Sequence, residues 1–231
     1  MHSTSAIHRR AGLLLWAGLL LFAGWKAWDL GRPGEPLPRE QRVAAGFAAL
    51  READDQGQLV LLGDSITAGH HWQAAAGCPK TLNLAISGAT TGDLLTHLDL
   101  ARRAGARRAL LMIGINDLHH DVPLAELLAN YRAILDRLQR GGITPLLQST
   151  LRVTPLHRDH QRLNGQVAEL NRQLRAWAQQ QGWLYLDVQA VIPPRGYRGD
   201  GLHLNAEGYA AWQRLIGPLL CGGSGQSGQA H

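Results

Sequence analysis

The segment LVLLGDSIT, residues 59–67, decides the fold. Its apolar residues are typical of a buried strand, and they run directly into Gly-Asp-Ser and the start of a helical pattern. A strand that turns into a helix here would place the Ser65 hydroxyl at the edge of a parallel sheet. The free N–H groups of the helix N-terminus suit an oxyanion forming beside a serine. The structural alternative is that Asp64 or Ser65 simply caps the helix.

Strand and helix patterns alternate along most of the chain. Apolar runs predict buried strands at residues 59–62, 81–86, 109–113, 144–148 and 183–186. Helical periodicity occurs at residues 39–53, 67–76, 92–104, 123–140, 163–181 and 205–216. This alternation predicts an α/β fold with a doubly wound, five-stranded parallel sheet, flavodoxin-like in its three α/β/α layers. Ligands of such folds gather at the carboxyl ends of the strands, so functional residues are expected there.

The composition fits one globular domain with tails. Of the 231 residues 45% are hydrophobic and 18% are charged, which is ordinary for a folded protein. We expect the domain at residues 39–220, after a Pro/Gly-rich linker at residues 31–38 and before a Gly/Ser/Gln tail at residues 221–231. The sequence contains neither a CxxC nor an HExxH motif, so no metal and no cofactor are expected.

Residues 1–30 predict an export segment. Arg9 and Arg10 precede an uncharged, leucine-rich run at residues 11–25, and Lys26 ends it. As a helix this run spans about 22 Å against a hydrocarbon core of roughly 30 Å, although the lysine can snorkel. No pair of small residues suits signal peptidase, which favours an uncleaved membrane anchor over a cleaved signal. The folded domain would then be periplasmic or otherwise extracytoplasmic, or secreted if cleavage occurs.

The formal net charge of +5 does not indicate a nucleic-acid-binding protein. Arg9, Arg10 and Lys26 flank the N-terminal apolar run, and about +2 remains without them. The other arginines are interspersed with acidic and polar residues and form no stripe that could follow phosphates. Solvated surface arginines are therefore the better interpretation.

Two cysteines occur, Cys78 and Cys221. Export would permit a disulfide between them, and the predicted topology puts both at the end of the sheet away from the functional edge. Two separate thiols remain the other interpretation, since the sequence cannot place their Cα atoms within disulfide range.

Asp200 and His203 are the expected partners of Ser65. A serine is a poor nucleophile unless a base takes its proton, and these two residues lie three apart in a loop after the fifth predicted strand. A carboxylate at that spacing can accept a bond from Nδ1–H across a turn and leave Nε2 to face the serine. The structural alternatives are that Asp200 is simply a turn residue before Gly201 and that His203 lies at the start of a helix.

Gly88 and Asn116 are the candidate donors to an oxyanion. Gly88 follows the second predicted strand, where the lack of a side chain lets a backbone N–H approach a substrate closely. Asn116 follows the third predicted strand and is succeeded by Asp117. Taken alone, each could be a turn glycine or a loop-capping asparagine.

Four blocks of the sequence together resemble the SGNH (GDSL) hydrolase family. They are GDSIT from Gly63, NLAISGATT from Asn83, GIND from Gly114 and DGLHLNAEGY from Asp200, in the family's order. The resemblance covers residues 58–216 and implies a serine ester hydrolase with Ser65, Asp200 and His203 as its triad. It also implies an oxyanion hole formed by Ser65, Gly88 and Asn116, with Asp64 and Asp117 as supporting motif residues.

The resemblance also guides the expected substrate. Ile66 and Thr67 stand where thioesterase and lysophospholipase relatives often have Leu and Ser, and the chain looks closer to bacterial relatives of platelet-activating-factor acetylhydrolase and to carbohydrate O-acetylesterases. We therefore expect short-chain, chiefly acetyl, esters of a small molecule or glycan. The alternatives are a lysophospholipase or thioesterase for longer acyl chains, an envelope acyltransferase and, least favoured, a noncatalytic binding module.

Overall fold

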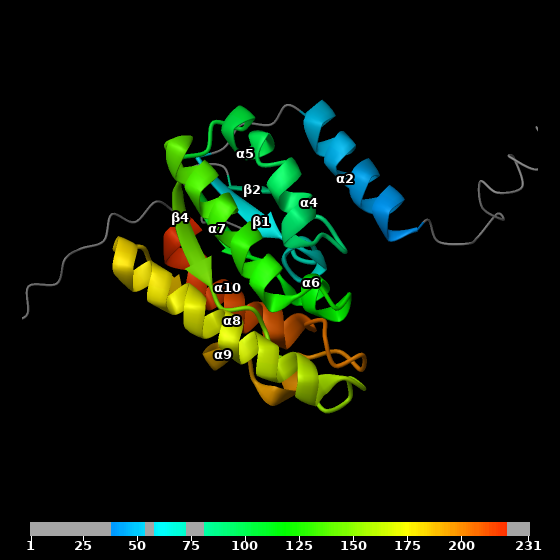
Figure 1. Cartoon of the computed structure of the whole chain (residues 1–231). Helices are drawn as coiled ribbons and strands as arrows, with labels where there is room; N and C mark the ends of the chain where they lie inside the picture. Colours follow the sequence, from blue (N-terminus) through cyan, green and yellow to red (C-terminus); the bar gives the residue numbers. More distant parts are fainter. Residues whose placement is uncertain (1–37, 54–57, 73–80, 221–231) are drawn as a thin grey trace, which may run out of the picture. The chain divides into compact units, whose positions relative to one another are not determined.

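The computed structural model describes residues 38–53, 58–72 and 81–220 (Figure 1). Its contacts divide the chain into Met1–Gln41 and Arg42–His231, and the second unit contains the sheet. The export segment, nearly all of the linker, both cysteines and the tail lie outside the described residues, so their interpretation stays a prediction. Within those residues, no helix combines the length and apolar character that a membrane crossing requires.

Five strands form one parallel sheet in the order β2-β1-β3-β4-β5. Their bounds are β1 Leu59–Gly63, β2 Thr81–Asn83, β3 Arg108–Met112, β4 Thr144–Gln148 and β5 Tyr185–Leu186. This strand order is that of flavodoxin-like folds, with the reversal between β1 and β3. The predicted α/β fold with a five-stranded parallel sheet is confirmed.

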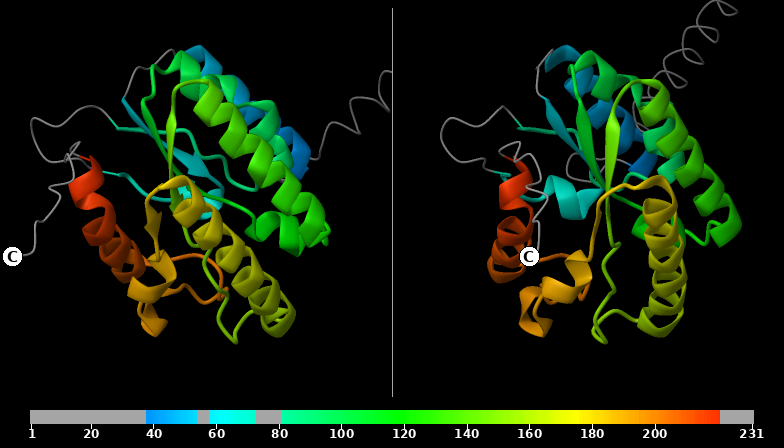
Figure 2. Two further views of the ribbon diagram at one scale, coloured as in Figure 1. Left: turned by 60° about the vertical axis from the view of Figure 1, so that its left-hand side comes forward. Right: turned by 90° about the vertical axis from the view of Figure 1, so that its left-hand side faces the viewer.

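Helices cover both faces of the sheet (Figure 2). Their bounds are α2 Arg39–Ala53, α3 Ser65–Ala68, α4 Thr91–Thr96, α5 Asp99–Arg103, α6 Ile115–His119, α7 Leu124–Arg140, α8 His160–Gln181, α9 Val188–Val191 and α10 Ala206–Leu220, with a 3-10 turn at Pro194–Gly196. Helices α7 and α8 lie on one side of the sheet and α10 on the other. Every residue of β1 is buried, as expected for a parallel strand with helices on both sides. Tyr131 of α7 and Trp212 of α10 are fully buried on these helices.

The predicted helices at residues 67–76 and 92–104 are wrong in extent. Helix α3 ends at Ala68, because the Thr67 carbonyl accepts from the side chains of Trp72 and Asn83. The second helix breaks into α4 and α5, because the Asp93 carbonyl accepts from the Thr96 hydroxyl and contacts His97 Nδ1 instead of continuing the helical ladder. In both places side chains compete with backbone N–H groups for hydrogen bonds to carbonyls. The spacing of apolar residues along the sequence gives no sign of this competition.

The second predicted strand, residues 81–86, is also shorter than expected. Strand β2 ends at Asn83, yet the N–H groups of Leu84 and Ile86 still donate to Leu61 and Gly63 of β1. The chain therefore follows β1 to its carboxyl end. The segments after β1 and β2 therefore leave the sheet at the same edge.

Gly208 of α10 marks a close backbone approach that offers a stability test. A Cβ there would lie 2.3 Å from the Gly196 carbonyl oxygen, whereas a Cβ at Gly165 of α8 would meet nothing within 4 Å. We expect Gly208→Ala to lower the free energy of unfolding by about 1–3 kcal/mol through overpacking. Gly165→Ala should raise it by about 0.5–1 kcal/mol, because glycine is unfavourable inside a helix. Urea unfolding of both variants tests this, and equal midpoints would contradict it.

Candidate active site

The turn from β1 into α3 places Ser65. A Cβ at Gly63 would lie 2.5 Å from both the Met112 carbonyl and the Thr67 hydroxyl, so only glycine fits there. Asp64 is extended and its Oδ1 accepts from the Ile66 N–H at 2.9 Å, which makes it the helix cap. The cap is therefore supplied by Asp64, and the hydroxyl of Ser65 is free of that task.

Ser65, His203 and Asp200 form one hydrogen-bonded chain. Ser65 Oγ lies 3.0 Å from His203 Nε2, across 138 residues of sequence, and His203 Nδ1 lies 2.7 Å from Asp200 Oδ2. With the proton on Nδ1 facing the carboxylate, Nε2 is the acceptor that faces the serine. The structure thus brings together the three residues that the sequence selected.

The Asp200 carboxylate is held ionised. Partial burial by itself raises its pKa, but the Leu202 and His203 N–H groups donate to Oδ1 at 2.9 Å and the imidazole bonds Oδ2. The hydrogen bonds outweigh the desolvation and lower the pKa of Asp200 to about 2. The group therefore stays negative at any pH at which a histidine can act as a base.

Gly88 and Asn116 follow strands that end beside Ser65. Gly63 is in register with Met112 and also accepts from the Ile86 N–H, so the segments after β1, β2 and β3 leave the sheet at one edge. Gly88 has a φ of 83°, a left-handed conformation that favours glycine. Asn116 Nδ2 donates to the Ala89 carbonyl at 2.9 Å, and an amide carries a second hydrogen for a ligand. Their role as oxyanion donors stays a proposal.

Asp117 ties these two segments together. Its carboxylate is 1% exposed and accepts from the Thr91 N–H at 2.9 and 3.1 Å and also from the Thr91 hydroxyl. Burial raises the pKa of Asp117, since the desolvation exceeds the effect of these bonds. The residue that the sequence marked as motif support is thus a link between α6 and the N-terminus of α4.

The sequence patterns did not identify the residues whose side chains donate hydrogen bonds to the backbone of α3. The Tyr209 hydroxyl donates to the Ile66 carbonyl and Trp72 Nε1 donates to the Thr67 carbonyl, both at 2.9 Å. The His70 ring stacks on Tyr209 at 4.8 Å. Tyr209 belongs to the same sequence block as His203, but no spacing argument shows that its hydroxyl returns to the helix of the nucleophile.

The segment after β4 supports the loop that carries the triad acid and base. The Thr154 N–H donates to the Gly201 carbonyl at 2.8 Å, and Gly201 has a φ of 71°. The Asn164 amide of α8 both donates to and accepts from the backbone of Val153 at 2.9 Å. The sequence motifs did not point to this segment, so its supporting function is an addition.

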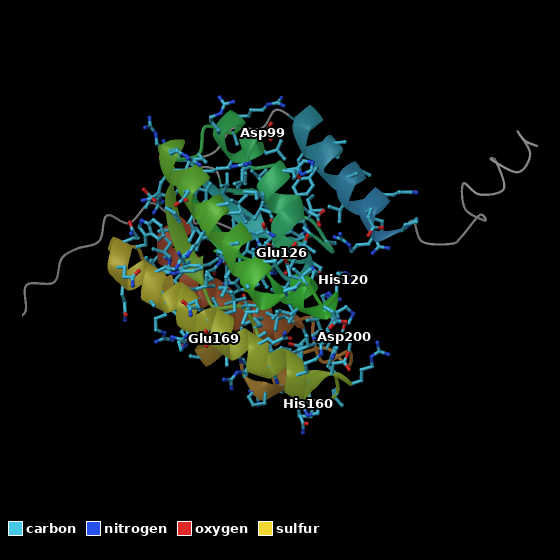
Figure 3. The ribbon with its side chains drawn as sticks, in the orientation of Figure 1. Asp99, His120, Glu126, His160, Glu169 and Asp200 are labelled. Atoms are coloured by element: carbon cyan, nitrogen blue, oxygen red, sulfur yellow. The ribbon has the colours of Figure 1, made fainter. Side chains whose placement is uncertain are left out.

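A polar rim lies near this edge. The rings of His119 and His157 are 5.6 Å apart, and Arg162 pairs with Asp121 at 3.0 Å. Figure 3 shows His120, His160 and Asp200 at the same end of the domain. In the residues that the structure describes, His, Cys, Asp and Glu form no cluster of three suited to a metal. The absence of a metal or cofactor from the reaction stays a prediction.

Asp64 gives the fold a testable pH dependence. Complete burial raises the pKa of Asp64 from 3.8 to about 7, although the Ile66 N–H bond opposes the shift. Between these values the unfolded state has lost a proton that the folded state keeps, so this group makes stability fall as pH rises. Asp64→Asn keeps an oxygen for the cap but does not titrate. We expect its stability relative to the parent to rise by about 1.4 kcal/mol per pH unit over that window.

Urea unfolding of the parent and of Asp64→Asn at several pH values from 4 to 9 measures the difference. It should grow up to about pH 7 and then level off, because both states of the parent are ionised above that value. A difference that stays constant over the whole series would contradict the raised pKa of this carboxyl.

Comparisons with known proteins agree with this geometry. Residues 61–211 match the model of the GDSL-like lipase/acylhydrolase family. A Streptococcus pneumonia protein whose description refers to platelet activating factor is similar in structure, with a TM-score of 0.69, 24% identity and coverage of 88% of this chain and 98% of that chain. A GDSL-like lipase from Bacteroides thetaiotaomicron gives 0.62 at 20% identity, covering 78% of this chain and 96% of that chain.

An acetylxylan esterase from Geobacillus stearothermophilus gives a TM-score of 0.56 at 17% identity, covering 70% of this chain and 93% of that chain. These identities establish likeness of fold alone. A search of curated proteins found no match. The family model covers well over half of the chain, and the resemblance drawn from the four sequence blocks is confirmed. The chain belongs to the GDSL-like lipase/acylhydrolase family and is an ester-bond hydrolase.

Proposed function

We propose that the chain hydrolyses short-chain carboxylic esters, chiefly acetyl esters, through an acyl-enzyme on Ser65. The observation that carries the proposal is the chain of contacts from Ser65 Oγ to His203 Nε2 at 3.0 Å and from His203 Nδ1 to Asp200 at 2.7 Å. This arrangement can remove the serine proton and stabilise the imidazolium that results.

In the proposed acylation, Ser65 Oγ attacks the ester carbonyl while His203 Nε2 takes the hydroxyl proton. The N–H groups of Ser65 and Gly88 and the Asn116 amide stabilise the negative oxygen of the tetrahedral intermediate. The C–O bond to the alcohol then breaks, and His203 returns the proton to the departing oxygen. In deacylation His203 takes a proton from water, whose oxygen attacks the acyl carbonyl. The bond between the acyl carbon and Ser65 Oγ then breaks, His203 returns the proton to Oγ, and the carboxylic acid leaves.

A short acyl group suits the surroundings of Ser65. On one side the aromatic rings of His70, Trp72, Tyr209 and Trp212 pack against each other and against α3, so that region is filled. The nearby rim that contains His119 and His157 is polar. A small acyl group on a polar alcohol fits such walls better than a long alkyl chain. The similarity to an acetylxylan esterase points the same way.

Rates on p-nitrophenyl acetate, butyrate and decanoate test the acyl preference. We expect kcat/KM to fall steeply with chain length, since the space around Ser65 suits a small acyl group. A rise towards decanoate would contradict the proposal and favour a lysophospholipase or thioesterase.

Ser65→Ala should abolish turnover of the acetate, and a fluorophosphonate probe should label the parent only. Comparing products with and without an acceptor sugar separates hydrolysis from acyl transfer.

Asp200→Asn tests the triad without disturbing the loop. An amide oxygen can still accept from the Leu202 and His203 N–H groups, so the backbone geometry should persist. The variant loses the charge that stabilises the imidazolium and favours the wrong tautomer. We expect kcat to fall by up to about 10⁴-fold, with only a small decrease in the urea midpoint from loss of the charge that these hydrogen bonds stabilise. A kcat within about threefold of the parent would remove Asp200 from the triad.

A further inference from the structure

A pocket lies at the end of the sheet remote from Ser65. It has a volume of about 380 Å³ and is lined by the last turns of α7 and α8 and by Trp183. Trp183 comes just before β5, so the pocket lies at the amino end of that strand, whereas the triad lies beyond the carboxyl ends. In Figure 1 the carboxyl ends of α7 and α8 lie on the left, and Figure 3, in the same orientation, labels Asp200 on the right.

The apolar part of this pocket consists of Leu135, Trp177 and Trp183. Trp183 is partly exposed, and Trp177 is 8% exposed with the Arg132 guanidinium over its ring at 4.7 Å. An indole offers a large, rigid apolar surface. Trp177 is buried with Arg132 over its ring, so the apolar surface open to a ligand is that of the partly exposed Trp183 indole. The apolar C–H face of a pyranose ring is a natural partner for it. The catalytic residues make no use of either tryptophan.

The polar part of the pocket consists of amides and a balanced pair of charges. Gln139, Gln180 and Gln181 are exposed around it, and within the described residues their side-chain amides take part in no hydrogen bond. An amide presents both donors and an acceptor, which is what a hydroxyl group requires. Arg132 and Asp136 add opposite charges, so the pocket carries no net charge to select an anion or a cation.

We propose that this pocket binds a neutral glycan and so holds the esterase on a polysaccharide surface. Its volume falls within the range of about 300–1,000 Å³ that is usual for small-molecule sites. The partly exposed indole of Trp183, the amides and the charge neutrality together match a neutral sugar better than a phosphate, a fatty acyl chain or a basic peptide. Binding here does not require the catalytic residues, so the inference does not depend on the proposed acyl preference.

Calorimetric titration of the full chain with xylohexaose and with cellohexaose tests the proposal. We expect binding of at least one hexasaccharide, weakened at least about tenfold by Trp183→Ala because the stacking face is lost. The double variant Gln180→Ala/Gln181→Ala should also bind more weakly, and its exposed positions avoid the folding risk of removing an indole. Turnover of p-nitrophenyl acetate should be unchanged in both variants.

Gln161→Ala is the matched control, since it removes the same side chain from an exposed position at the other end of α8. It should bind like the parent, and so should a parent whose Ser65 has been blocked by a fluorophosphonate. The proposal is overturned if the folded parent binds neither hexasaccharide at millimolar concentration or if all variants bind equally. It is equally overturned if blocking Ser65 abolishes binding, because the sugar would then occupy the catalytic cleft.

Discussion

The close backbone approach at Gly63 is the constraint on which the active site depends. Strand β1 passes so near the Met112 carbonyl and the Thr67 hydroxyl that no side chain fits, and the chain can turn into α3 at once. Asp64 fixes that turn by capping the Ile66 N–H. A looser turn would move the serine hydroxyl away from the 3.0 Å contact with His203, and small displacements of reacting groups are costly in rate.

Side chains from distant segments then hold the backbone around this turn. Tyr209 and Trp72 bond successive carbonyls of α3, and Asp117 bonds the amide of Thr91. Each such bond contributes about 1 kcal/mol net, but losing one partner in a buried place leaves an unpaired group that costs about 1–3 kcal/mol. The site is therefore held by a set of polar contacts. Removing one partner of such a contact costs more free energy than the net contribution of the bond.

The sequence predicted the features that depend on local spacing or on periodicity. It did not predict the features that depend on side-chain contacts between more distant residues. Apolar runs and helical spacing predict the parallel sheet, and the three-residue spacing of Asp200 and His203 predicts a carboxylate that bonds an imidazole across a turn. The early end of α3 escaped prediction, because its causes are side-chain donors from residues 5 and 16 positions further along the chain. The link from Tyr209 to Ile66 spans 143 residues, and no pattern in the chain encodes it.

Three carboxylates near one edge of the sheet differ in charge because their surroundings differ. Burial raises the pKa of Asp64 to about 7 and also raises the pKa of Asp117, whereas the bonds to Asp200 lower its pKa to about 2. Asp200 is therefore negative throughout the neutral and mildly acidic range. In both buried carboxyls desolvation favours the neutral form, and both accept hydrogen bonds from backbone N–H groups, Asp64 from Ile66 and Asp117 from Thr91. The buried carboxyls of Asp64 and Asp117 thus support the backbone. The more exposed carboxylate of Asp200 supplies the negative charge beside His203.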